Sequence, residues 1–245
     1  MARCPSLPCL AILLAIFTAS FTARADCEPA HITRALGIEE SWLENAASLT
    51  WQGGQTFAAG ADLAFNRNIG MELDLPTWDA VSHAVSPAIG AGLKVRLYGP
   101  CQPHSSATYV TAELEGQYNT RARPAPPGQG DLIAGQIEWA VIRPAGFFQG
   151  EIGRSVALGV GGLPGWFINA SLGRRFHLVT LQCEFEVDNT LPPGPYGTIE
   201  GSVGPQIAFW LTPSWLLALG EQRTFTRVPA TPRYSTWLLL EREFD

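Results

Sequence analysis

The chain has 245 residues, of which 46% are hydrophobic and only 16% are charged. A chain of this length can bury a core without disulfide support, and this composition excludes a disordered protein or a charge-rich helical bundle. The sequence has 16 basic and 22 acidic residues, with Lys94 as its one lysine. It therefore lacks the basic surface that a nucleic-acid partner requires.

Residues 1–25 have the pattern of a signal peptide. Arg3 precedes the apolar run from Cys9 to Phe21, and Ala23-Arg24-Ala25 has the small-x-small form of a cleavage site. The apolar run is too short to cross the roughly 30 Å of hydrocarbon in a bilayer. We therefore expect export and cleavage, with Asp26 as the first residue of the mature chain.

Residues 26–43 are expected to form an N-terminal segment on the periplasmic side. Within it, Ile32, Leu36, Trp42 and Leu43 have roughly helical spacing, so the pattern is compatible with a short helix. The expected barrel domain follows at residues 44–245.

Three cysteines, Cys27, Cys101 and Cys183, remain after cleavage, so at most one disulfide can form within the chain. Cys27 and Cys101 are the candidate pair because both lie outside the predicted strands. A lipoprotein reading of Cys27 is disfavoured because Asp26 occupies the place of a small residue. No Cys or His cluster has metal-ligand spacing, and we expect neither a metal nor a cofactor.

After residue 43 the dominant pattern is strict alternation of apolar and polar residues, which is typical of β-strands. For example, Leu63 follows Asp62, and Leu73 lies between Glu72 and Asp74. In chain order the pattern predicts strands at residues 44–52, 56–65, 69–76, 88–98, 107–118, 131–142, 150–160, 165–174, 177–187, 197–210, 214–225 and 232–244.

The predicted connections alternate in length. Brief turns at 66–68, 174–176 and 211–213 are separated by loops rich in Pro and Gly at 77–87, 119–130, 188–196 and 226–231. His177, near a strand start, is interpreted as a turn residue. The alternation predicts an antiparallel up-and-down barrel of 10 to 12 strands, twelve by our best count, with a short-turn end and a long-loop end.

Alternation alone is also compatible with a soluble barrel or sandwich whose apolar face points inward. Strands of roughly 9 to 13 residues suit a tilted bilayer crossing, however, and such a barrel is too wide for side chains to fill. Aromatic residues near the strand ends suit the headgroup level of a membrane. These are Tyr98, Tyr118, Trp139, Phe147, Phe148, Trp166, Trp210, Trp215 and Tyr234. We therefore predict an apolar face toward lipid and a polar face toward the barrel axis.

The chain ends in YSTWLLLEREFD, with Tyr234, Leu238, Leu240 and Phe244 at alternating positions. This end resembles the terminal strand of proteobacterial outer-membrane β-barrel proteins, although Asp245 follows the phenylalanine and Arg242 lies on the apolar face. The stretch FAAGADLAFNRNIGMELDLP followed by AIGAGLKVRLY is similar to putative transporters associated with meta-pathway phenol degradation. The resemblance implies a barrel inserted by the barrel assembly machinery into outer-membrane lipid, which passes or binds small molecules.

On this reading the polar face is net acidic. Its candidate lining residues are Asp62, Glu72, Asp74, Lys94, Arg96, Glu113, Glu115, Glu138, Glu184, Glu186 and Glu200. An acidic lining favours cations or polar neutral solutes. The same charges are equally compatible with Lys94 and Arg96 paired to neighbouring carboxylates that hold a plugged interior together.

Three functions follow, in order of preference. The first is a passive channel or small-molecule transporter of the Gram-negative outer membrane, with both termini periplasmic and an unidentified solute. The second is a closed structural or adhesive barrel. The third is a lipid-modifying hydrolase, which the sequence disfavours because His31, His83, His104 and His177 belong to no hydrolase motif. We therefore expect no catalytic residues.

Overall fold

The computed structural model describes residues 43–53, 56–79, 88–100, 106–119, 131–158, 164–189, 200–225 and 234–244. Its strands are β1 (Ala46–Gln52), β2 (Thr56–Ala64), β3 (Ile69–Asp74), β4 (Trp78–Asp79), β5 (Ala88–Tyr98), β6 (Ala107–Asn119), β7 (Asp131–Arg143), β8 (Gly146–Leu158), β9 (Pro164–Phe176), β10 (Val179–Asp188), β11 (Glu200–Thr212), β12 (Trp215–Thr224) and β13 (Tyr234–Glu243).

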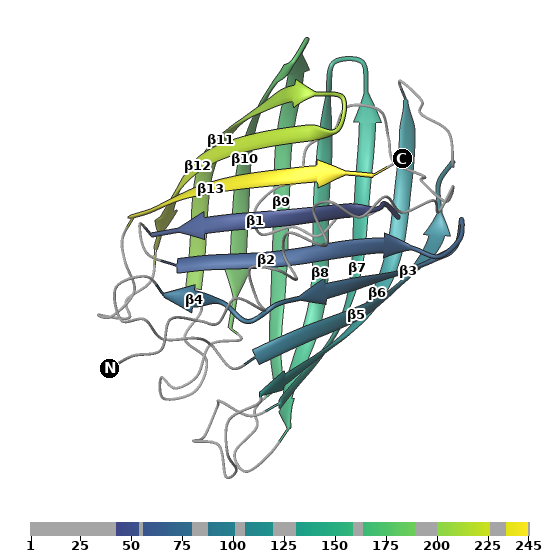
Figure 1. Cartoon of the computed structure of the whole chain (residues 1–245), viewed down its shortest axis with the longest axis vertical. Helices are drawn as coiled ribbons and strands as arrows, with labels where there is room; N and C mark the ends of the chain where they lie inside the picture. The colour runs from purple at the N-terminus through teal and green to yellow at the C-terminus, as the bar shows by residue number, and fades with distance from the viewer. Residues whose placement is uncertain are drawn as a thin grey trace.

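The strands form one closed antiparallel barrel (Figure 1). Each strand pairs with its neighbours in sequence, and β1 closes the sheet by pairing with both β2 and β13. The short β4 pairs with β2 beyond the end of β3, so the two share one place in the wall and the barrel has twelve strands. In Figure 1 the near-wall strands β13, β1 and β2 cross the far-wall strands β6–β9 at a large angle, as strand tilt in a barrel requires.

Alternate residues of each strand point to opposite sides of the wall. Leu93 and Leu181 are 49% and 47% exposed on the outside, whereas Glu72 and Glu184 are only 4% and 3% exposed on the inside. A soluble barrel would show the reverse arrangement, with leucine inside and glutamate outside. The predicted all-β fold and its strand count are confirmed, and the apolar face is the outer one.

The structure differs from the sequence-based expectations in the limits of several strands and in the direction of two aromatic side chains. Strand β9 continues to Phe176, through the turn expected at 174–176, and the short β4 lies in the loop expected at 77–87. Strand β8 begins at Gly146 rather than near residue 150, because Arg143 pairs with Gly146 around a tight turn at Pro144-Ala145. Phe147 and Trp210, expected at the membrane surface, are buried at 4% and 8% exposure on the inner face. Both residues lie near a strand end, as predicted. The alternation of side chains along β8 and β11 places them on the inner face.

The short connections meet at one end of the barrel. β2 and β3, β7 and β8, β9 and β10, and β11 and β12 are joined there, and Ala46 of β1 lies opposite Glu243 of β13. His177 adopts a φ of 56° in the β9–β10 turn, which confirms its interpretation as a turn residue. No helix in the described part of the chain is long and apolar enough to cross a membrane. The signal peptide, residues 28–42 of the candidate helix, Cys27 and Cys101 lie outside the described residues, and Leu43 is not helical.

Candidate functional site

The candidate site is the polar belt on the inner face of the barrel. Seven carboxylates of the strands are buried there against one buried cation, Lys94. The carboxylates are those of Asp62, Glu72, Glu113, Glu138, Glu151, Glu184 and Glu241. Amide and hydroxyl side chains lie between them, namely Ser48, Thr111, Gln136, Gln149, Asn169, Ser171, Thr180, Gln182 and Gln206. The belt is therefore polar all round and strongly acidic.

Lys94 lies at the centre of an acidic cluster formed by four adjacent strands. Its Nζ is 3.0 Å from Glu72 Oε2, 3.3 Å from Asp62 Oδ1 and 3.9 Å from Glu113 Oε2. The register explains the cluster, since Asp62 pairs with Glu72 and Lys94 pairs with Glu113 across their strands. All four side chains are almost completely buried, so their mutual attraction is little screened by solvent.

A glycine makes room for this cluster. A Cβ added at Gly92 would lie 2.9 Å from the carboxyl carbon of Glu113 and closer still to its Oε1. The Glu113 side chain therefore lies flat against the wall over Gly92, on the strand that carries Lys94. This approach is available only to glycine, which has no side chain of its own.

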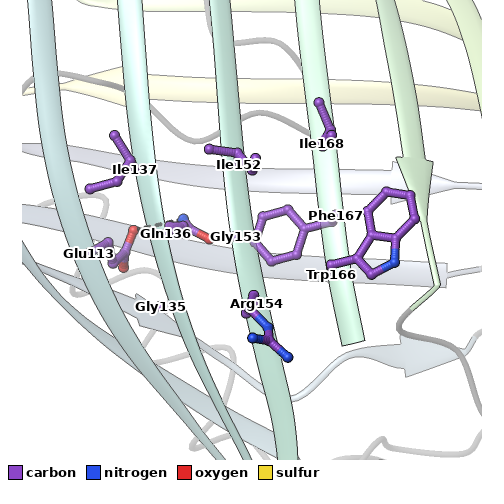
Figure 2. A pocket seen from close by; sticks show the side chains of 10 residues that line it. All are labelled: Glu113, Gly135, Gln136, Ile137, Ile152, Gly153, Arg154, Trp166, Phe167 and Ile168. Atoms are coloured by element: carbon purple, nitrogen blue, oxygen red, sulfur yellow. Dashed lines mark hydrogen bonds between the residues drawn. The ribbon is translucent and has the colours of Figure 1, made fainter. Parts of the chain in front are cut away.

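Gln136 extends the cluster along the wall. Its Nε2 donates hydrogen bonds to Glu113 Oε2 at 3.1 Å and to Glu138 Oε1 at 3.0 Å. Figure 2 shows Gln136 and Glu113 together on strands β6 and β7 of this wall. A neutral amide thus links two carboxylates without cancelling the charge of either.

Neutral amide side chains also donate hydrogen bonds to polar groups of the belt on strands β8–β11. Asn169 Nδ2 donates to Glu151 Oε1 at 2.6 Å, and Gln182 Nε2 donates to Gln206 Oε1 at 2.5 Å. Gln206 in turn donates to Glu184. Amide donors satisfy carboxylate oxygens in this region, so the negative charge of the belt is retained.

Toward the long-loop end, Glu186 forms a smaller cluster with two polar neighbours. Its Oε2 accepts hydrogen bonds from Ser202 Oγ at 3.0 Å and Gln222 Nε2 at 2.8 Å. Gln222 also donates to Ser202 Oγ at 2.7 Å. These half-buried contacts continue the polar lining away from the short-turn end.

Toward the short-turn end the inner face becomes largely apolar, although Glu241 of β13 and Thr180 of β10 are also buried there. Buried clusters there contain Ala107, Tyr109, Ala140, Ile142 and Phe147 on one side, and Ala208, Trp210, Leu216, Ala218, Trp237 and Leu239 on the other. Leu43 and Ala64 form a third. The guanidinium carbon of Arg175 lies 5.9 Å from the Trp210 ring centre. The acidic belt is therefore bounded by an apolar layer.

Two aromatic rings of this layer lie flat over glycines of the next strand. A Cβ at Gly220 would lie 2.4 Å from Trp237 Cε2, and one at Gly173 would lie 2.3 Å from Phe147 Cζ. The rings therefore lie against the wall rather than along the barrel axis.

The outer face is apolar across its middle, and its arginines lie toward the two rims. Arg223 stacks on Phe225 and Tyr234 at the long-loop end, each at 5.7 Å. At the short-turn end Arg242 stacks on Trp215 at 5.7 Å and on Phe244 at 4.9 Å. Charged heads at two rims with aliphatic side chains between them match a membrane-spanning band.

A groove of about 810 Å³ crosses strands β7–β9 of this wall (Figure 2). Two rows of outward residues flank it, Gly135, Arg154 and Trp166 on one side and Ile137, Ile152 and Ile168 on the other. Gly135 leaves the groove open because it has no side chain. Glu113, Gln136, Gly153 and Phe167, which alternate in their strands with outward residues, also line the groove.

The predicted lining residues fall into three groups. Asp62, Glu72, Lys94, Glu113, Glu138 and Glu184 are buried, and Asp74, Arg96, Glu115 and Glu186 are half-buried. Arg96 donates to Asn68 Oδ1 at 2.9 Å. Glu200 pairs with Asp188 in the β10–β11 register. Within the described ranges no group of three His, Cys, Asp or Glu residues is arranged to hold a metal ion.

Two buried carboxylates of the strands were not singled out from the sequence. Glu151 alternates with Ile152 on β8, and Glu241 alternates with Leu240 on β13. Both could have been found by continuing the period-two pattern to the end of each strand. His177 is the one histidine among the described residues, and it is exposed in its turn.

A closed antiparallel barrel with a polar interior, an apolar outer band and aromatic rims defines an outer-membrane type of β-barrel. Solved porins share this fold. The chain aligns with KdgM porin over 83% of its length and 100% of that chain, at a TM-score of 0.54 and 8% identity. With NanC porin the coverage is 82% and 99%, the TM-score 0.55 and the identity 5%. No known protein family and no curated protein matches the sequence.

Proposed function

We propose that this protein is a passive channel of the Gram-negative outer membrane that admits small cations and polar neutral solutes. The proposal rests on the acidic belt, which contains seven buried carboxylates and one buried lysine. A conduit lined by one sign of charge within a low-dielectric wall concentrates counter-ions and repels co-ions.

The charge of the belt argues against an anionic solute. One solved KdgM porin, with a TM-score of 0.52 and 9% identity to this chain, holds disordered oligogalacturonate. An acidic sugar chain would meet Glu138 and Glu184 in the belt proposed here, and Lys94 is already surrounded by carboxylates. The shared fold thus supports passage of solutes, whereas the side chains support a different charge preference.

Features of the sequence indicate where the protein is located and which solute to assay. Residues 1–25 would direct export, and the terminal strand ending at Phe244 would be recognised by the barrel assembly machinery. The similarity to transporters associated with phenol degradation adds phenol, a small neutral solute, to those worth assaying. A closed structural barrel is the second candidate, and the apolar layer at the short-turn end favours it.

Planar bilayers test the proposal directly. In a gradient of potassium chloride, the purified full chain should conduct, and its reversal potential should have the sign of a cation-selective pore. Replacing two belt carboxylates, Glu138→Gln and Glu184→Gln, should move the reversal potential toward zero because it removes fixed negative charge from the interior.

Glu221→Gln provides the matched control. Glu221 is an exposed residue of β12, in register with Thr236 on the outer face, so its loss should leave the reversal potential unchanged. A folded protein that passes neither ions nor phenol would refute the channel and leave the structural barrel. An equal shift in both variants would refute the role of the acidic belt.

A further inference from the structure

A second outer-surface groove, of about 630 Å³, lies at the short-turn end of strands β7–β10. One side is formed by Phe148, Leu172 and Cys183, which are neighbours in register on β8, β9 and β10. The other side is formed by Arg143, Gly146 and Arg174 on β7, β8 and β9. The groove therefore has one apolar side and one side with two cations.

The two arginines flank a gap. Arg143 pairs with Gly146 in the β7–β8 register, and a Cβ added at Gly146 would lie 3.8 Å from the Cβ of Arg174. Because glycine has no side chain, the space between the two arginines is open from the outside. Guanidinium groups bind phosphate through paired N–H donors, so two arginines on either side of an uncovered glycine offer such a group two partners.

Both guanidinium groups have N–H donors that make no hydrogen bond within the described part of the chain. Arg143 uses Nη1 for the carbonyl oxygens of Ile142 at 2.6 Å and Ala107 at 3.3 Å. Arg174 lies over the Phe176 ring at 5.1 Å. Neither arginine forms an ion pair with a carboxylate of the described residues. Asp131, at the opposite end of β7, is the one carboxylate on the outward faces of β7–β10 in that part of the chain.

The apolar side of the groove is open to the surroundings. Leu172 is 63% exposed and Phe148 is 39% exposed, although both are large hydrophobic residues. An occupant that satisfies the whole groove must combine an apolar chain with an anionic head. Inorganic phosphate would leave the apolar side uncovered, and a neutral lipid would leave the two cations without a counter-charge.

We propose that this groove binds one anionic phospholipid. Its phosphate lies between Arg143 and Arg174 over Gly146, and one acyl chain extends from there toward the middle of the membrane across the row formed by Phe148, Leu172 and Cys183. Arg143 and Arg174 lie next to tight turns, at the level where lipid headgroups meet a barrel of this kind.

Native mass spectrometry of the purified full chain in mild detergent tests the site. With phosphatidylglycerol added, a one-to-one lipid adduct should be retained about tenfold better than with phosphatidylcholine, as two arginines near a headgroup imply. The double variant Arg143→Gln with Arg174→Gln should reduce phosphatidylglycerol retention to the phosphatidylcholine level. Excess inorganic phosphate should not displace the lipid.

Two further variants separate charge from shape. Arg223→Gln also removes an outward arginine, but one that stacks on Phe225 and Tyr234, so it should keep the full preference for phosphatidylglycerol. Cys183→Phe fills the apolar side and should weaken the adduct several-fold with both arginines intact. Equal retention of the two lipids, loss of the preference in Arg223→Gln, displacement by phosphate, or an unchanged adduct in Cys183→Phe would each overturn the proposal.

Discussion

Lys94 carries the one positive charge among the fully buried side chains of the described strands. Three carboxylates share it, those of Asp62, Glu72 and Glu113. Removing one partner from a buried ionic group leaves the others with an uncompensated charge, which is more costly than never having formed the group. The stability of this wall therefore depends on a single ammonium group.

We expect Lys94→Met to lower the free energy of unfolding by about 3 to 5 kcal/mol, because it leaves three buried carboxylates without their cation. Urea denaturation in lipid vesicles, followed by circular dichroism, measures this loss. Lys94→Arg keeps the charge and should lose clearly less. Equal losses in the two variants would show that packing, and not charge, decides the effect.

For residues this far apart in the chain, the sequence predicts which face of the sheet each one occupies. It does not predict which of them contact one another. The alternation in each strand predicts that Asp62 and Lys94 share the polar face. It does not predict a distance of 3.3 Å between their charged atoms, because that depends on the registers of two strand pairs, β2–β3 and β3–β5.

At the scale of the element, β13 closes the barrel and ends in a compact group of rings and charge. Phe244 is 6% exposed, and Arg242 lies 4.9 Å from its ring centre and 5.7 Å from that of Trp215. The backbone N–H of Phe244 also donates to the Asn45 carbonyl at 2.8 Å. The end of the last strand is thereby fastened to the start of the first.

Phe244→Ala should destabilise the folded barrel by about 3 kcal/mol, since it truncates a buried ring at the closing seam. Tyr234→Ala changes the other end of the same strand, where the ring is 58% exposed, and should cost little. Thermal unfolding and the yield of folded barrel in outer membranes would be measured for both. A comparable loss in the tyrosine variant would contradict the special role of the chain end.

The sequence predicted Tyr234 and Phe244 on one apolar face, and the structure leaves Tyr234 58% exposed but Phe244 only 6% exposed. The sequence did not predict what Arg242 contacts. The two rings come from different elements, and only the β12–β13 register, in which Trp215 pairs with Arg242, brings one of them there.

For the whole molecule, the interior is largely acidic along the middle of the barrel and largely apolar toward the short-turn end, where Glu241 is also buried. The acidic belt would set which solutes enter, and the apolar layer at the short-turn end would set how easily they pass. Apolar constrictions resist the entry of ions because water and ions are poorly solvated there. Conductance should therefore respond to the apolar layer more than to the outer surface.

A comparison of two tryptophans of one hairpin tests this division. Trp210 is 8% exposed on the inner face, whereas Trp215 is half-buried on the outer face. Trp210→Ala should raise single-channel conductance by opening the apolar layer, at a stability cost of about 3 kcal/mol or more. Trp215→Ala should leave conductance unchanged, and a rise in that variant would argue against a constriction in the layer.

The sequence by itself determined that this protein is a barrel with most of its strand leucines outward and most of its strand glutamates inward. A strand repeats every two residues, so parity assigns each side chain to a face without any knowledge of the fold. The same rule places Phe147 and Trp210 inside, once β8 and β11 have the limits that the structure gives them.

Only the tertiary structure decided how deep along the barrel each side chain lies and which side chains it contacts. Parity fixes a face but carries no information on depth along the barrel, so the division into an acidic belt and an apolar layer became visible only with the strands in register. The placement of Arg143 and Arg174 on either side of Gly146 has the same origin, since three strands must align before two surface arginines become one anion site.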